Sequence, residues 1–291
     1  MKKKILLTGG KGFFCTRFTE KYKHDYEILS TDKDDLDITD EDKVLKAFEE
    51  FKPDYVIHAA AIAVTDFCNK HPEIAHKINV EGAVNVAKAC KSVNAKMVFI
   101  SSEQVFNGNT EAGPYSETHI PLPNTVYGEN KLEAEGLLKE ILHELWIVRY
   151  TWLFGFPERN TNINPNILWD TLQIALKGEK TKVTNNEFRG LTYVHELIDQ
   201  YYKIFELPFG TYHVGSKNNL SRYKITCHIL KELGLEERIS LLIEKDIEKY
   251  KDAPRDVRLD CNKISKLGFN FSESKDGITK CINEFKFKII K

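Results

Sequence analysis

Hydrophobic residues follow two alternating patterns in the first half of the chain. Short runs rich in β-branched residues predict buried strands at residues 5–8, 26–30, 55–59, 96–101 and 145–150. Longer segments place hydrophobic residues on one helical face and predict helices at 12–23, 40–51, around 80–87 and at 126–143. Strands that alternate with helices are typical of an α/β fold with a doubly wound parallel sheet. The loops after the strands then meet at one edge of the sheet, where ligands bind.

The alternation weakens beyond residue 155. The pattern there predicts helices at 166–177 and 223–233 and a strand at 210–214, with less regular segments between them. We expect residues 1–155, completed by about residues 183–215, to form the domain that contains the sheet. Residues 156–291 are then expected to form mainly a smaller C-terminal lobe that covers one edge of this domain.

Charge and cysteine usage narrow the class of protein. The 291 residues include 42 Lys and Arg against 43 Asp and Glu, a balance that argues against a nucleic-acid-binding protein. The hydrophobic run at 5–7 is too short for a signal peptide or a membrane span. The six cysteines are scattered, without the spacing of a metal site, and fit reduced thiols. We therefore expect a cytoplasmic protein with no metal, nucleic-acid or membrane partner.

A glycine-rich loop follows the first predicted strand. Gly9 and Gly12 allow a tight turn in which backbone N–H groups approach a pyrophosphate at a helix N-terminus. Asp32 ends the second strand about 20 residues later, where an acidic residue binds the adenosine ribose of a dinucleotide. This pattern predicts a Rossmann-type NAD(P)-binding domain with NADPH or NADH as cofactor. The acid favours NADH, whereas Lys11 and Lys33 can neutralise the extra phosphate of NADPH. The candidate cofactor-binding residues here are Gly9, Gly10, Lys11, Gly12, Phe13, Phe14 and Asp32.

A tyrosine and a lysine follow the fourth predicted strand at helical spacing. Tyr127 and Lys131 are four residues apart, so their side chains lie on one face of the predicted helix. An ammonium group at that distance is expected to lower the pKa of the phenol. Ser102, at the end of the fourth strand, can hold a substrate oxygen. A Tyr–Lys pair alone is also common on solvated helices, and its place after a Ser-bearing strand makes the catalytic interpretation stronger.

The chain resembles the extended short-chain dehydrogenase/reductase family, and within it the dTDP-4-dehydrorhamnose reductase branch, over nearly its full length. The segments that carry the resemblance include TGGKGFF (8–14), DLDITD (35–40), KPDYVIHAAA (52–61), SSEQVFNG (101–108), VYGENKLEAE (126–135), IVRYTWLFG (147–155) and APRDVRLDCNK (253–263). The resemblance implies a Rossmann-type domain with a smaller C-terminal substrate-binding lobe.

The resemblance also implies roles for individual residues. Asp37 and Ile38 would lie beside the adenine, and Ala59, Ala60 and Ala61 would pack along the cofactor. Ser102 would orient a sugar carbonyl and Tyr127 would donate the proton. Lys131 would bind the nicotinamide ribose and tune Tyr127. The candidate substrate-binding residues are Glu103, Gln104, Trp152, Arg189 and Arg255, with Arg258 as a further cation that could bind a phosphate.

Four positions depart from the pattern of the family. Cys15 replaces the third glycine of the loop, and Leu191 replaces a proline. Glu103 and Gln104 stand where the family usually has Asp-Tyr, so that an aromatic hydroxyl thought to face the substrate is missing. These departures concern the sugar rather than the redox residues.

Three functions are compatible with these features. The first is NAD(P)H-dependent reduction of the C4 keto group of a nucleotide-linked 4-keto-6-deoxy sugar, in nucleotide-sugar and polysaccharide biosynthesis. The second is a nucleotide-sugar epimerase or dehydratase with bound NAD, and the third is a non-catalytic regulatory subunit that binds NAD(P). A dehydratase normally needs a pair of acid–base carboxylates, and Gln104 leaves only Glu103. The expected partner is a nucleotide-sugar substrate, and the expected assembly is a homodimer.

Overall fold

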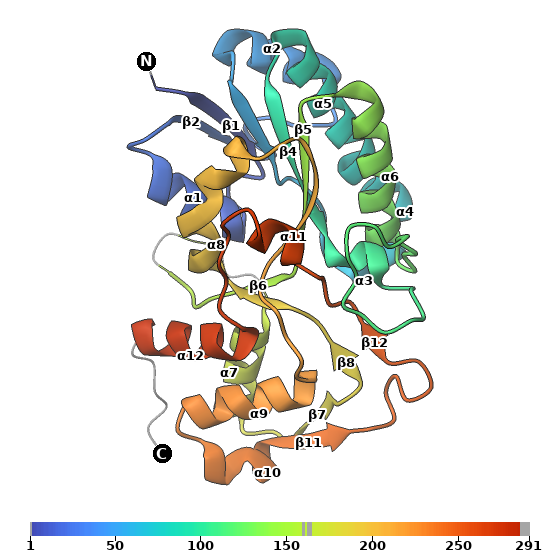
Figure 1. The fold of residues 1–291 in the computed structure, drawn as a ribbon, viewed down its shortest axis with the longest axis vertical. Coiled ribbons are helices and arrows are strands. Elements are labelled where there is room, and N and C mark those ends of the chain that lie inside the picture. Colours follow the sequence, from blue (N-terminus) through green and yellow to red (C-terminus); the bar gives the residue numbers. More distant parts are fainter. Residues whose placement is uncertain (1, 159–160, 162–164, 286–291) are drawn as a thin grey trace.

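The computed structural model describes residues 2–158, 161 and 165–285. Six parallel strands form its central sheet in the order β10-β5-β4-β3-β1-β2 (Figure 1). Their bounds are β1 Lys4–Thr8, β2 Glu27–Thr31, β3 Tyr55–His58, β4 Lys96–Ser102, β5 Leu145–Tyr150 and β10 Gly210–Val214. This order, which reverses direction at β1 and β3, confirms the predicted doubly wound Rossmann-type sheet.

Helices cover both faces of the sheet. The helices α1 (Phe13–Tyr22) and α8 (Val194–Gln200) pack together on one face. The helices α2 (Glu41–Phe51), α5 (Gly82–Val93) and α6 (Val126–Ile141) line the other face (Figure 1). Each face has its own hydrophobic cluster, with Phe18 and Tyr201 in the first and Phe48 in the second. The sheet is therefore buried on both sides, which explains why its strands are almost continuously hydrophobic.

Side-chain caps begin two of these helices. The Asp40 carboxylate accepts a hydrogen bond from the backbone N–H of Lys43 and begins α2. Thr125 accepts one from the N–H of Gly128 and begins α6, two residues before Tyr127. Such caps satisfy N–H groups that a helix leaves unpaired at its start. The start of α6 thus fixes where the side chain of Tyr127 lies.

The predicted helix around residues 80–87 is interrupted in the structure. Two short helices, α3 (Thr65–Lys70) and α4 (Pro72–His76), precede a π-helical turn η1 (Lys77–Glu81) that leads into α5. The buried Asn79 side chain lies in this turn and binds both backbone groups of Ile62. A π-helical turn in an α-helix frequently marks a functional site. Here it holds the loop that follows β3.

Most of the remaining elements are short strand pairs and helices below the sheet (Figure 1). Three parallel pairs join β6 (Trp152–Phe154) to β9 (Leu191–Tyr193), β7 (Thr181–Thr184) to β11 (Ile243–Asp246), and β8 (Glu187–Phe188) to β12 (Arg255–Asp256). The helices are α7 (Ile167–Lys177), α9 (Arg222–Glu232), α10 (Ile239–Leu242), α11 (Asn262–Ser265) and α12 (Ser274–Phe285). The 3₁₀ turns are η2 (Glu103–Phe106), η3 (Tyr201–Glu206) and η4 (Glu236–Arg238).

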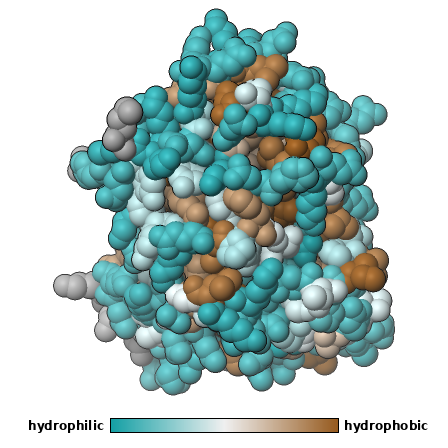
Figure 2. Space-filling view, turned by 45° about the horizontal axis from the view of Figure 1, so that its top comes forward, coloured by the Kyte–Doolittle hydropathy of each residue, from teal (hydrophilic) through white to brown (hydrophobic). Residues whose placement is uncertain are grey.

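Hydrophilic side chains cover most of the face in Figure 2, with hydrophobic ones exposed between them. In the described part of the chain, no helix is long and apolar enough to cross a membrane. The six cysteines are free. Cys15, which replaces the third glycine of the loop, is buried against β1, and its thiol donates to the carbonyl of Thr8. Burial raises its pKa to about 12, so this position packs the helix against the strand as a small hydrophobic residue.

Candidate active site

The glycine loop joins β1 to α1 and packs closely against the neighbouring backbone. Gly9 has a φ of +73°, and a Cβ atom built there would lie 2.8 Å from the backbone nitrogen of Ala60. A Cβ at Gly12 would lie 2.9 Å from the carbonyl oxygen of Gly9. A side chain at Gly9 would displace the loop after β3, and one at Gly12 would displace the glycine loop itself, so only glycine fits these two positions. This close-packed, side-chain-free cradle at the start of α1 is the shape that a dinucleotide pyrophosphate needs.

The two phenylalanines after the loop contribute differently from the glycines. The Phe14 ring packs in an aromatic cluster with Phe18, Tyr150 and Tyr201, with ring centroids 4.8 to 5.9 Å away. The Phe13 ring is buried below the guanidinium of Arg17, 3.9 Å from its centroid. Both side chains are therefore part of the core. What the two residues can offer a ligand is their backbone N–H groups in the first turn of α1, which have no partner within the helix.

Asp32 lies at the end of β2, beside the glycine loop. One carboxylate oxygen accepts a hydrogen bond from the backbone N–H of Lys11 at 2.9 Å, and the other accepts from the N–H of Lys33 at 2.8 Å. The structure thus brings the predicted acid to the loop, although the two are 21 residues apart in the sequence. The Lys11 ammonium pairs with Asp34 at 2.9 Å.

The residues predicted to lie beside the adenine and along the cofactor occupy the neighbouring loops. The Asp37 carboxylate accepts from the backbone N–H and hydroxyl of Thr39, and these bonds lower its pKa. The Ile38 side chain is buried against Gly82. Ala59, Ala60 and Ala61 follow β3 and are half-buried, and the N–H of Ala60 bonds to the hydroxyl of Thr8. All of these residues lie at the carboxyl edge of the sheet.

Ser102 and Tyr127 meet at the same edge. Ser102 is the last residue of β4, and Tyr127 lies in the first turn of α6, which packs against the turn after β4. Burial raises the pKa of Tyr127 to about 12, and the neighbouring Ser102 hydroxyl opposes this shift only in part. The phenol is therefore protonated at neutral pH.

Lys131 lies one turn after Tyr127 in α6 and is buried. Its ammonium donates to the carbonyl of Ile100 at 2.8 Å and lies 4.7 Å from the ring centroid of Phe99. The distance from the ammonium to the ring centroid of Tyr127 is 5.9 Å. The prediction that this lysine brings the pKa of the phenol below its usual value is wrong for the structure described here, because burial raises that pKa and Lys131 is not among the groups that shift it. Burial also lowers the pKa of Lys131 to about 8.

Glu103 and Gln104, the departures from the family pattern, are both buried and engaged. The Glu103 carboxylate pairs with the guanidinium of Arg189, while its second oxygen is buried without a partner among the described residues. Burial raises the pKa of Glu103, and the charge of Arg189 opposes this shift. The Gln104 side-chain oxygen accepts a hydrogen bond from Arg255 at 3.0 Å. Two of the predicted substrate-binding arginines are thus bound to the two residues that follow Ser102.

Glu187, which the sequence analysis did not identify, connects these arginines. Its carboxylate is buried and lies 2.9 Å from Arg255, 3.3 Å from Arg222 and 3.8 Å from Arg189. Burial opposes its ionisation, but the three guanidinium charges outweigh burial and hold its pKa below the usual value. No local pattern marks Glu187 as functional, since its partners come from β12, α9 and the loop after β8.

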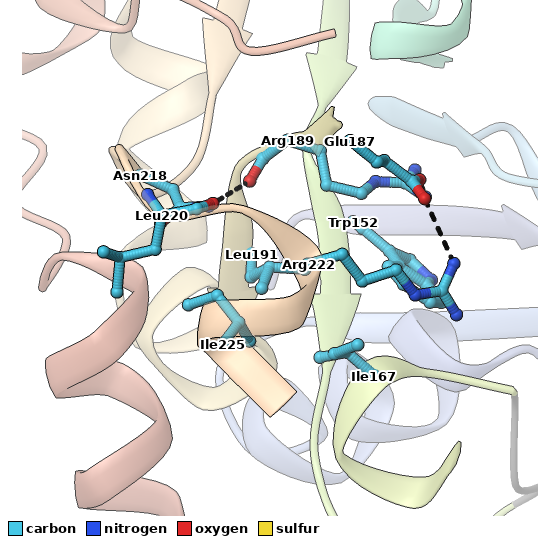
Figure 3. A pocket seen from close by; sticks show the side chains of 9 residues that line it. All are labelled: Trp152, Ile167, Glu187, Arg189, Leu191, Asn218, Leu220, Arg222 and Ile225. Atoms are coloured by element: carbon cyan, nitrogen blue, oxygen red, sulfur yellow. Dashed lines mark hydrogen bonds and ion pairs between the residues drawn. The ribbon is translucent and has the colours of Figure 1, made fainter. Parts of the chain in front are cut away.

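The Trp152 ring lies close to two of these arginines (Figure 3). The guanidinium carbons of Arg189 and Arg222 lie 4.4 and 5.7 Å from its ring centroid. The pocket around them has a volume of about 10 Å³, room for about one water molecule, so the side chains close it in this structure. Arg258 lies apart, since its guanidinium binds the Asp256 carboxylate and the carbonyl of Gly113. Arg258 therefore connects the segment at Asp256 with the loop at Gly113 and has a structural role.

A buried histidine at the end of β3 bonds to the end of β1. His58 ends β3, and its Nδ1 lies 2.7 Å from the hydroxyl of Thr8. Burial lowers its pKa to about 3, and the charge of Lys131 acts in the same direction. The ring is therefore neutral at physiological pH. No local pattern predicts this contact, because a histidine in a hydrophobic strand is usually a core residue.

Comparison with known proteins agrees with this geometry. The family described as RmlD substrate binding domain matches residues 2–287. The spore coat polysaccharide biosynthesis protein SpsK of Bacillus subtilis (strain 168) is 30% identical over 237 residues, 81% of each chain. Methionine adenosyltransferase 2 subunit beta of Xenopus laevis is 25% identical over 280 residues, 91% of this chain and 83% of that protein. The crystal structure of dTDP-4-dehydrorhamnose reductase from Bacillus anthracis in complex with NADP has a TM-score of 0.86 and 27% identity, and the match covers 98% of this chain and all of that one.

The family match spans both the sheet with its glycine loop and the short strand pairs that hold Glu187 and Arg255. It confirms the resemblance that the motifs at residues 8–14, 101–108 and 126–135 indicate. This chain is a member of the RmlD substrate binding domain family, within the extended short-chain dehydrogenases/reductases.

Proposed function

We propose that this protein uses NADH or NADPH to reduce the C4 keto group of a nucleotide-linked 4-keto-6-deoxy sugar, in nucleotide-sugar and polysaccharide biosynthesis. The observation that carries the proposal is the placement of Ser102, at the end of β4, beside Tyr127, in the first turn of α6, at the sheet edge that also holds the glycine loop. Lys131 lies buried one turn from Tyr127. The solved dTDP-4-dehydrorhamnose reductase with bound NADP, which matches this chain over nearly its whole length, supports the same reaction.

The residues at the sheet edge would hold the cofactor. Gly9 and Gly12 make the cradle for the pyrophosphate, and Asp32 lies where the adenosine ribose is expected. Ala59, Ala60 and Ala61 would pack along the cofactor at this edge of the sheet. When bound, the reduced nicotinamide supplies a hydride to the carbonyl carbon of the sugar.

The hydroxyl groups of the chain act on the carbonyl oxygen. Ser102 donates a hydrogen bond to this oxygen and holds it near Tyr127. Tyr127 is protonated at neutral pH, since its pKa is about 12, and donates its proton as negative charge develops on the oxygen. The Lys131 ammonium stabilises the phenolate that remains.

The surroundings of Ser102 favour reduction over dehydration. A dehydratase needs two free acid–base groups near the catalytic hydroxyl. Glu103 is ion-paired with Arg189, and Gln104 is a neutral amide bound to Arg255. Neither residue is available to move a proton while these contacts persist.

We also propose that Trp152, Arg189 and Arg255 form part of the sugar-nucleotide site. Their pocket is nearly closed, so substrate binding requires that the side chains around Trp152 move apart. Guanidinium groups match the oxygens of a nucleotide diphosphate.

The proposed cofactor domain comprises residues 1–155 with about 183–215, which include β10. A homodimer in the cytoplasm is the proposed state, and sedimentation analysis of the purified protein tests the assembly.

The test follows absorbance at 340 nm with dTDP-4-keto-6-deoxyglucose and its 3,5-epimerised product, with NADH and NADPH offered separately. We expect oxidation of a cofactor by at least one of these sugars. Tyr127→Phe should lower turnover by about 10²- to 10⁴-fold, the usual contribution of a general acid, while cofactor affinity stays unchanged. The exposed Tyr202→Phe is the matched control and should retain full activity.

Two outcomes would contradict the proposal. Near-normal turnover of Tyr127→Phe would exclude this phenol as the proton donor. Cofactor binding without oxidation, together with co-purification of a larger enzyme, would favour a non-catalytic subunit. The match to methionine adenosyltransferase 2 subunit beta makes this the alternative to test.

A further inference from the structure

The rim of the cofactor site next to Asp32 carries an excess of acidic groups. Asp32, Asp34 and Asp35 follow β2 directly, and the cations beside them are Lys11 and Lys33. The Asp32 carboxylate is held by the backbone N–H groups of both lysines, and the Asp35 carboxylate accepts from the N–H of Asp32 at 3.1 Å. These bonds hold the Asp32 carboxylate in place at the end of the glycine loop, so it cannot swing away from a ligand.

The side chain of Lys11 is engaged with this acidic rim. Its ammonium donates a charge-assisted hydrogen bond to the Asp34 carboxylate at 2.9 Å. The hydrogen bond from Lys11 and, to a smaller extent, the charge of Lys33 hold the pKa of Asp34 below its usual value. Both cations that could neutralise a phosphate here therefore already lie near carboxylates.

The two nicotinamide cofactors differ at this rim alone. NADPH carries a phosphate on the adenosine ribose where NADH carries a hydroxyl, and such a monoester has a charge of about −1.5 to −2 at pH 7. A fixed carboxylate accepts a hydrogen bond from the ribose hydroxyl, whereas it repels the phosphate. A binding site for the phosphate needs cations that are free to face it.

We propose that this protein prefers NADH to NADPH, and that Asp34 sets the preference together with Asp32 by pairing with the Lys11 ammonium. The inference rests on the proposed function only for the identity of the cofactor site. Asp32 binds the ribose hydroxyl of NADH, and Asp34 keeps Lys11 away from the position that the phosphate of NADPH would occupy. Asp34 is a specificity-determining residue in this arrangement, and it takes no part in the chemistry.

The test measures binding directly, without a sugar substrate. Isothermal titration calorimetry of the full-length protein gives the dissociation constants of NADH and NADPH. We expect NADH to bind at least about tenfold more tightly to the wild type, since one fixed carboxylate and one masked lysine act against the phosphate. Asp34→Asn should tighten NADPH binding by about 3- to 10-fold and change NADH binding by less than about twofold.

Three further measurements separate this effect from a general change in charge. Asp199→Asn is the matched control, because Asp199 forms a similar exposed pair with Lys21 at 2.6 Å and lies in α8. It should leave both dissociation constants unchanged. Adding Lys11→Gln to Asp34→Asn should remove the gain in NADPH affinity. The gain should also shrink as NaCl is raised from 0.05 to 0.5 M, because salt screens exposed charges.

If the wild type binds NADPH as tightly as NADH or more tightly, the proposed NADH preference is wrong. The proposed reductase function would still hold in that case if a sugar substrate oxidises NADPH. An NADH preference that Asp34→Asn leaves unchanged would overturn the role of Asp34. A preference that holds without any turnover on a sugar would support the coenzyme inference while it contradicts the proposed reaction.

Discussion

Glu187→Gln removes a buried carboxylate that three guanidinium groups share. Its side chain is only 2% exposed, while those of Arg189, Arg255 and Arg222 are 15%, 21% and 33% exposed. Removing one partner of a buried ion pair costs about 3–5 kcal/mol, because the other charge stays desolvated. The arginines keep some contact with water, so we expect a loss near the lower end, about 3 kcal/mol.

Thermal unfolding followed by tryptophan fluorescence measures this loss. For a chain of this size, 1 kcal/mol shifts the midpoint by about 2–4 °C, so Glu187→Gln should lower it by about 6–12 °C. Glu179→Gln is the control, because Glu179 is exposed in the loop before β7. It should stay within about 0.5 kcal/mol of the wild type.

A double variant tests the cause of the destabilisation. If unpaired positive charge is responsible, adding Arg222→Gln to Glu187→Gln should recover part of the loss, because it removes one of the cations left behind. A loss below about 1 kcal/mol in Glu187→Gln would refute the reasoning. So would strict additivity of the two substitutions, since residues 3.3 Å apart in one network should be coupled.

Other predictions concern pH and the residues around the cofactor. Lys131 has a pKa of about 8, so its ammonium is present below that pH and lost above it. Turnover should therefore fall above about pH 8. The pH–rate profile of Lys131→Met should lack this fall at alkaline pH. His58 has a pKa of about 3 in the folded protein against about 6.5 when unfolded, so the unfolded state binds the extra proton and stability is lost as pH falls from 6.5 towards 3. Urea unfolding at pH 7 and pH 5 should therefore show a smaller decrease for His58→Asn, by up to about 1.4 kcal/mol per pH unit, and an unchanged decrease would contradict this account. His213, whose pKa burial likewise lowers to about 3, should account for part of the decrease that remains.

Local sequence patterns predicted much of the fold and of the redox site. The predicted strands at 5–8, 96–101 and 145–150 agree with β1, β4 and β5 to within one residue at each end, because buried parallel strands are hydrophobic throughout. The short strand pairs were not predicted, since strands of two to four residues have too few positions to show a period. The π-helical turn at Asn79 also has no periodic signal of its own.

Site residues that lie close together in the sequence could also be predicted from the sequence alone. The glycine loop, Asp32, and the Tyr127–Lys131 pair each belong to one strand–turn–helix unit, so their geometry follows from the element that carries them. The sign of the pKa shift of Tyr127 did not follow. It depends on burial, which comes from every element packed around the phenol, whereas the spacing to Lys131 reports a single neighbour.

The sequence by itself determined the parallel sheet, the cofactor loop and the reacting side chains, because these follow from hydrophobic period, glycine placement and helical spacing. Only the tertiary structure decided what the arginines do. Arg189 meets Glu103 across 86 residues of sequence, and Arg255 meets Gln104 across 151. The identity of a charged residue does not indicate whether its side chain faces solvent or a buried carboxylate. Its partner is set by how the strand pairs pack below the sheet, and that packing arises from the whole chain rather than from any one segment.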